Sequence, residues 1–180
     1  MGSILQALSP FELYAGLRDF LEAGGDVLFA IMLVTFLMWV LIAERYWYFA
    51  TAFPRTAKEK LKIWNQRTDH RSWHAHQIRT AMLSELRLES HQYIDTIKTL
   101  VAVAPLFGLL GTVTGMVEVF DVMALTGSSN ARAMSAGITK ATIPTMAGMV
   151  AALSGLYFST QLERRARRAV ERVEDDLPLN

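Results

Sequence analysis

Residues 99–124 read TLVAVAPLFGLLGTVTGMVEVFDVMA. The first nineteen of them, Thr99 to Val117, carry no charge, and about 20 apolar residues cross the hydrocarbon core of a bilayer. The stretch therefore predicts a transmembrane helix. It is a poor simple anchor, however, because glycine, proline and threonine interrupt it at positions where leucine would serve as well.

One side of this predicted helix is small and slightly polar. At about 100° per residue, five residues fall within about 100° of one another: Ala104, Gly108, Gly111, Thr112 and Gly115. The opposite side is bulky, with Leu106, Leu109, Leu110, Val113 and Met116. A lipid-facing surface gains nothing from glycine, whereas a surface that another backbone approaches does. We expect the small side to face protein or a narrow pore.

Composition bounds the class of protein. A chain of 180 residues usually forms one domain, and much of its 52% hydrophobic content lies in three long runs. The basic residues flank these runs and do not form one patch with interleaved aromatics, so no nucleic-acid binding is expected. There is no cysteine, which excludes disulfides and cysteine–zinc sites. No basic region precedes the first apolar run, so we expect no cleaved signal peptide.

The N-terminal part predicts two helices. Residues 9–12, SPFE, form a capping box with proline at the first helical position. The amphipathic segment 1–25, which ends at a glycine pair, is expected to lie along a membrane surface or to pack on neighbouring helices. The first transmembrane helix is predicted at 26–49, where an apolar run is closed by Glu44-Arg45 and an aromatic cluster, Tyr46 to Phe49.

Segment 50–98 is polar and basic, and we expect a cytoplasmic helical segment. From about Ile78 its apolar spacing is helical and predicts one helix running without a break into the central span. Three histidines in this segment, His70, His74 and His76, are expected in a solvated basic loop. No carboxylate or further histidine completes a metal-ligand motif with them. We expect no metal and no other cofactor.

The last part predicts a third span. After the central span (99–124) and a connection at 125–137, residues 141–162 carry no charge, and the third transmembrane helix is predicted at 138–162. It has a second small face, whose members fall within about 80°: Ala141, Thr145, Gly148, Ala152, Gly155 and Ser159. The tail, 163–180, begins with a basic cluster that we expect to contact membrane lipids: Arg164, Arg165, Arg167 and Arg168.

Lysine and arginine counts predict the orientation. One precedes the first span, ten lie between the first and second, two between the second and third, and five follow the third. By the positive-inside rule, we expect the N-terminus and the 125–137 connection outside the cytoplasm, and segment 50–98 and the tail in the cytoplasm. The fold class expected is an all-α membrane protein with three transmembrane helices and long cytoplasmic helical extensions.

The two small faces suggest a pore wall. The central and third spans form a hairpin, so Thr112 and Thr145 should lie within about one turn in depth. No Asp, Glu or His lies within Thr99–Val117 or Ala141–Leu162, so any carboxylate that accepts protons must come from a partner subunit. Glu118 and Lys140 share one level and suggest an ion pair. The candidate pore-lining residues are Thr112, Thr145, Gly108, Gly111, Gly115, Gly148 and Ala152.

Residues 104–113, APLFGLLGTV, followed by Gly115-Met116, closely resemble the second-span signature of the ExbB/TolQ/MotA family of proton-channel subunits. Gly137-Ile138 through Thr145, Gly148 and residues 150–152 resemble its third-span signature, and Glu44-Arg45 resembles the end of its first span. The short outer N-terminus and short cytoplasmic segment are more similar to ExbB and TolQ than to MotA. Lys140 departs from the family, which commonly has a glutamate near this position, and the role of a wall carboxylate is open.

This resemblance implies a homo-oligomer, a pentamer, whose second and third helices ring two transmembrane helices of an ExbD-like partner. The partner would supply the proton-accepting aspartate, and Thr112 and Thr145 would match the pore threonines. Proton flow would drive motion that is passed to TonB and so to outer-membrane receptors, as in siderophore or iron uptake. The alternatives are a TolQ-type subunit and a structural membrane oligomer without conduction. No enzyme is expected, because Ser154 lies across its helix from Thr145 with no histidine in reach.

Overall fold

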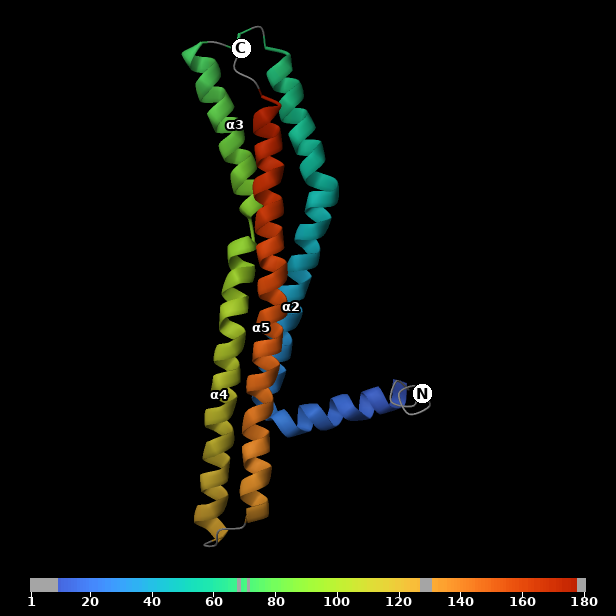
Figure 1. Ribbon diagram of the computed structural model, residues 1–180, viewed down its shortest axis with the longest axis vertical. Helices are drawn as coiled ribbons and strands as arrows, with labels where there is room; N and C mark the ends of the chain where they lie inside the picture. Colours follow the sequence, from blue (N-terminus) through green and yellow to red (C-terminus); the bar gives the residue numbers. More distant parts are fainter. Residues whose placement is uncertain (1–9, 68, 71, 127–130, 178–180) are drawn as a thin grey trace. The chain divides into compact units, whose positions relative to one another are not determined.

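The computed structural model describes residues 10–67, 69–70, 72–126 and 131–177. Within these ranges it contains four helices and no strand: α2 (Pro10–Asn65), α3 (Trp73–His91), α4 (Ile94–Thr126) and α5 (Ala131–Asp175) (Figure 1). Three stretches of the described chain are long and apolar enough to cross a membrane, namely Gly24–Asn65, Trp73–Leu125 and Gly137–Asp175. The predicted all-α class is therefore confirmed, and its three predicted spans fall on helices that are long and apolar enough to cross a membrane.

The chain divides into two compact units. The first unit comprises Met1–Leu37 and Leu100–Ser154, and the second comprises Met38–Thr99 and Gly155–Asn180. Helices α2, α4 and α5 each contribute residues to both units.

In the first unit, α2 begins at Pro10 and is interrupted at Gly25, whose φ of 64° and ψ of −166° are not helical. A positive φ at this value is costly for residues with a Cβ and routine for glycine. The chain therefore changes direction at Gly25 (Figure 1), where the glycine pair predicted the end of the first helix. Ser9, the predicted cap, lies outside the described residues.

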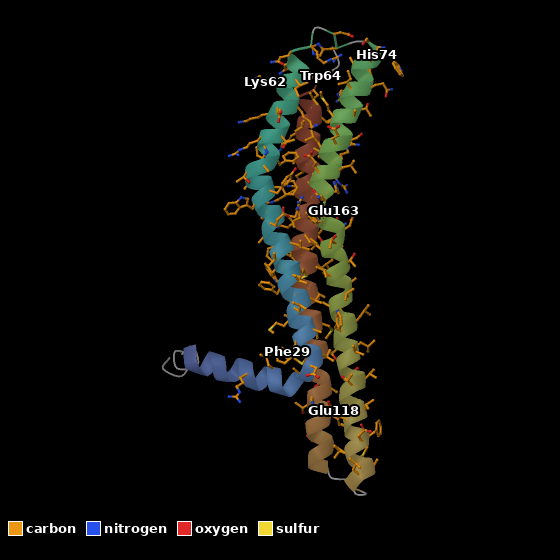
Figure 2. The ribbon with its side chains drawn as sticks, turned by 180° about the vertical axis from the view of Figure 1, so that it is seen from behind. Phe29, Lys62, Trp64, His74, Glu118 and Glu163 are labelled. Atoms are coloured by element: carbon orange, nitrogen blue, oxygen red, sulfur yellow. The ribbon has the colours of Figure 1, made fainter. Side chains whose placement is uncertain are left out.

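The second unit has its own hydrophobic core. Phe53, Ala57 and Trp64 of α2 pack with buried residues of α3 and with the end of α5; Trp64, labelled in Figure 2, is 1% exposed. The other buried members are Ala75, Leu83, Leu86, Val170, Val173 and Leu177. Within each segment these residues are three, four, seven or eight positions apart, which is the apolar stripe of a helix packed on one side.

Two predictions about segment 50–98 are wrong. It does not continue unbroken into the central span, because α3 ends at His91 and α4 begins at Ile94. Between them Gln92 is extended (φ −51°, ψ 134°) and Tyr93 has a φ of 64°. The histidines are not all in a loop: His74 and His76 lie on α3, which starts at Trp73, and the His70 ring packs edge-on against Trp64 at 5.0 Å.

The connection between the last two spans is also shorter than expected. Helix α4 continues to Thr126 and α5 begins at Ala131, so most of the predicted 125–137 connection is helical. Residues 127–130 lie outside the described part of the chain.

Candidate functional site

The small side of α4 is its buried side in the first unit. Ala104, Gly108, Gly111 and Gly115 are buried, while the bulky residues are exposed on the single chain: Leu106, Leu109, Leu110, Val113 and Met116. This division into two faces is the one that the helical periodicity predicted, and the small face contacts protein.

The protein that covers this face is α5 of the same chain. A Cβ on Gly108 would lie 2.9 Å from Thr145 Cα, and one on Gly148 would lie 2.6 Å from the Ala104 carbonyl oxygen. One on Gly115 would lie 2.8 Å from Ala141 Cα. Because the atoms in the way belong to the backbone, these glycines allow α4 and α5 to approach more closely than any side chain would permit.

Gly111 meets a different neighbour, which sequence reasoning did not identify. A Cβ there would lie 2.5 Å from Pro144 Cβ and 3.4 Å from Val27 Cγ1 of α2. Pro144 lies inside α5 and is fully buried. Gly111 therefore accommodates the proline ring at the point where α2, α4 and α5 meet. A proline within a predicted span, opposite a glycine-rich span, was the available signal.

The two threonines lie beside this contact. Thr145 Oγ1 donates to the Gly108 carbonyl oxygen across the helix pair at 3.2 Å, and Thr112 Oγ1 donates to the Leu109 carbonyl oxygen of its own helix at 2.7 Å. Both side chains are partly exposed. Since Thr112 follows Gly108 by four residues, the two hydroxyls differ in depth by about one turn. Ala152, the remaining member of the predicted set, is half-buried further along α5.

The charged residues form the pair that the sequence suggested. Lys140 Nζ lies 2.6 Å from Glu118 Oε2, and their side chains are 37% and 56% exposed. Glu118 is labelled on α4 in Figure 2. The Lys140 side chain also passes the kink, because a Cβ on Gly25 would lie 3.3 Å from Lys140 Cε.

Hydroxyls and charges lie on different sides of the α4–α5 pair. Gly111 and Lys140 face α2, through Val27 and Gly25 respectively. At about 100° per residue, Thr112 lies about 100° around α4 from Gly111, and Thr145 lies about 140° around α5 from Lys140. Both threonines are thus turned away from α2, toward the side of the pair that α2 leaves open.

Sequence reasoning did not predict that Arg45 is buried and contacts several residues in the second unit. Arg45 is 2% exposed; its Nη1 donates to the Glu89 carbonyl oxygen at 3.2 Å, and its Nε and Nη2 donate to Glu44 at 2.7 and 3.0 Å. Its guanidinium carbon lies 4.7 Å and 4.8 Å from the ring centroids of Tyr48 and Tyr93. The arginine therefore joins α2 to the junction between α3 and α4. A charged pair directly after an apolar run was the only sequence signal.

Comparison with known proteins agrees with this architecture. The model of the MotA/TolQ/ExbB proton channel family matches residues 50–175, more than half of the chain. The ExbB-like 3 biopolymer transport protein of Synechocystis sp. is 39% identical over 64 residues, which are 34% of this chain and 30% of the relative. The ExbB-like 1 protein of the same organism is 43% identical over 63 residues, 33% of this chain and 25% of the relative.

The biopolymer transport protein exbB1 of Vibrio cholerae is 32% identical over 96 residues, 51% of this chain and 42% of the relative. The chain thus spans less than half the length of each of these relatives.

Proposed function

This chain belongs to the MotA/TolQ/ExbB proton channel family, and on that premise we propose that it is an ExbB-type proton-channel subunit of a bacterial inner membrane. Its three apolar helices and its family make it a multi-pass membrane protein. In the proposed function it acts with an ExbD-like partner to convert proton motive force into mechanical work. That work would be delivered through a TonB-like protein to outer-membrane transporters, such as those for siderophore or iron uptake.

The observation that carries the proposal is the position of the two threonines. Their hydroxyls lie within about one turn of each other in depth and on the side of the α4–α5 pair away from α2. In a homo-oligomer with α2 outermost, a pentamer in our proposal, this side lines a central axis. Threonine hydroxyls both donate and accept hydrogen bonds, so they can hold water along that axis without a fixed charge.

The wall itself lacks a titratable group at depth. Because no Asp, Glu or His lies within Thr99–Val117 or Ala141–Leu162, the group that takes up and releases the proton belongs to the partner's transmembrane helix. In this arrangement Gly108, Gly111, Gly115 and Gly148 shape the wall by letting the helices approach. Ala152 adds only a small side chain to the wall. Pore lining by these four glycines and Ala152 stays a prediction.

The proposed orientation follows from charge. Ten of the lysines and arginines lie between the first and second apolar runs, and five follow the third, so this segment and the C-terminus are cytoplasmic and the N-terminus is periplasmic. The Glu118–Lys140 pair then sits at the periplasmic end of the hairpin.

Replacement of each threonine by valine tests the channel role. Thr112→Val and Thr145→Val preserve the side-chain shape and remove the hydroxyl. We expect both to reduce proton-dependent client uptake at least about tenfold, because each variant loses the hydrogen bonds that hold water along the axis. Thr114→Val is the matched control, since Thr114 lies two residues from Thr112 and bonds the Gly111 carbonyl oxygen of its own helix. Unchanged uptake in both channel variants would refute the proposal.

Co-purification distinguishes an ExbB-type subunit from a TolQ-type subunit. Capture of a complex that contains a TonB-linked partner supports the proposed client, whereas capture of a TolA-linked partner makes the chain a TolQ-type subunit of the Tol-Pal system. A homo-oligomer that gives no proton flux with either partner would be a structural membrane oligomer.

A further inference from the structure

A groove in the second unit combines an apolar floor with three arginines. It has a volume of about 490 Å³ and lies between α2 and α5. Phe49, Phe53 and Pro54 of α2 form one wall, with the two phenylalanine ring centroids 5.8 Å apart. The other wall belongs to α5, with Arg165, Arg168, Ala169, Arg172 and Val173.

Two acidic residues of α5 pair with α3 and α4, whereas three of its arginines line the groove against α2. Glu163 pairs with Lys98 at 3.0 Å, and Glu174 pairs with Arg87 at 3.0 Å and with Arg79 at 3.7 Å. These carboxylates thus neutralise basic side chains of α3 and of the start of α4. Among the described residues, no carboxylate lies within 4.0 Å of the three groove arginines. The groove is left with a concentrated positive charge.

One of these guanidinium groups is held in place. The Arg165 guanidinium carbon lies 4.8 Å from the centroid of the Tyr46 ring, and Tyr46 belongs to the aromatic cluster that ends the first apolar run. Leu162 is the last residue of the third uncharged run. At a rise of about 1.5 Å per residue, the backbone of Arg165 lies about 5 Å beyond it and that of Arg168 about 9 Å beyond it. The headgroup layer is about 5 to 7.5 Å thick on each side of the bilayer, so Arg165 falls within it and Arg168 lies at its outer edge, within reach of a long side chain.

We propose that this groove binds the headgroup of an anionic phospholipid, with Arg165 and Arg168 holding the phosphate and the phenylalanine wall covering the apolar part of the lipid. Arginine suits this role because its planar fork binds phosphate through two parallel hydrogen bonds. Arg172 lies further from the membrane and adds electrostatic attraction. The proposal does not depend on channel activity. It also divides the basic cluster, since Arg164 and Arg167 do not line the groove.

The test measures lipid retained by the purified full-length complex. The detergent-extracted complex is exchanged into micelles containing phosphatidylglycerol or phosphatidylcholine, and bound lipid is counted by mass spectrometry of the intact assembly. Arg165→Gln/Arg168→Gln is compared with Arg164→Gln/Arg167→Gln, which removes the same charge from the same turn of helix. We expect the groove pair to lower phosphatidylglycerol retention about tenfold or more, and the control pair to lower it less than about twofold. Arg165→Lys/Arg168→Lys retains the charge and should keep part of the binding.

Four results would overturn the proposal. One is equal retention of the two lipids by the wild type, and a second is equal loss in the groove and control pairs, which indicates diffuse attraction. A third is displacement of the lipid by millimolar inorganic phosphate, which identifies a free-anion site. The fourth is a changed mass of the assembly in the groove pair with no change in lipid retention, which identifies the groove as a protein contact.

Discussion

The backbone of Thr145 occupies the space where a side chain on Gly108 would begin. A Cβ on Gly108 would lie 2.9 Å from Thr145 Cα and 3.0 Å from the Pro144 carbonyl oxygen, whereas carbon atoms in contact prefer about 3.5 to 4.0 Å. This approach also brings the Thr145 hydroxyl within 3.2 Å of the Gly108 carbonyl oxygen. The absence of one side chain therefore sets both the spacing of α4 and α5 and the position of a candidate pore hydroxyl.

Gly108→Ala should destabilise this helix pair. Alanine favours a helix interior by roughly 1 kcal/mol over glycine, but the clash forces the helices apart at a cost of about 1 to 3 kcal/mol. We expect a lower melting temperature of the detergent-extracted complex. Val113→Ala is the control, because Val113 lies on the exposed, bulky side of the same helix. A Gly108→Ala complex as stable as the wild type would show that the spacing is not set here.

Arg45→Lys should loosen the junction between α3 and α4. Lysine keeps the charge but lacks the planar group that lies over Tyr48 and Tyr93 while donating to the Glu89 carbonyl oxygen. We expect a loss of about 1 to 3 kcal/mol and faster hydrogen exchange at the Ile97 amide, which donates to the Tyr93 carbonyl oxygen at 2.9 Å. Arg55→Lys, at an exposed position of the same helix, should leave that exchange unchanged; equal acceleration in both variants would contradict the prediction.

The Glu118–Lys140 pair should tolerate reversal better than either single change. Glu118→Lys places two cations side by side, as does Lys140→Glu with two anions, and the double variant restores attraction. Because both side chains are partly exposed, we expect a coupling of about 0.2 to 1 kcal/mol in a double-mutant cycle of melting temperatures. Asp121→Asn, at an exposed position nearby, serves as the control. Additive effects of the two reversals would argue against an energetic pair.

The wild type should be more stable than the Glu163→Gln variant at neutral pH but not at acidic pH. A hydrogen bond from Lys98, at 3.0 Å, lowers the pKa of the Glu163 carboxyl, against a smaller opposing effect of burial. A lowered folded-state pKa gives stability that is fully present above the unfolded value of about 4.3 and is lost as the pH falls through the folded value. The free energies of unfolding of wild type and variant should therefore differ at pH 7, by less than about 1 kcal/mol, and converge once the pH falls below the lowered pKa of Glu163 in the folded state. A gap that persists there would exclude the ion pair as its cause.

Several features of the fold were predictable from local pattern. The start of the first helix at Pro10, its end at the glycine pair, and the small and bulky sides of α4 all follow from residue type and helical spacing. The break at Tyr93 was not predictable, because apolar spacing on the two sides of it is compatible with one helix. Tyr93 adopts a positive φ in a setting where its ring lies over a buried guanidinium from a helix distant in sequence.

The sequence by itself determined that three long apolar runs exist and which side of the second and third is small. It also determined that no carboxylate or histidine lies within the second and third uncharged runs. Only the tertiary structure decided what covers those sides: the glycines meet backbone of the same chain, and the threonines are turned away from α2. It also divided the C-terminal arginines between a groove and the outer surface. The physical reason is that helical periodicity reports which residues share a face, whereas the neighbour of that face depends on contacts between residues far apart in the chain.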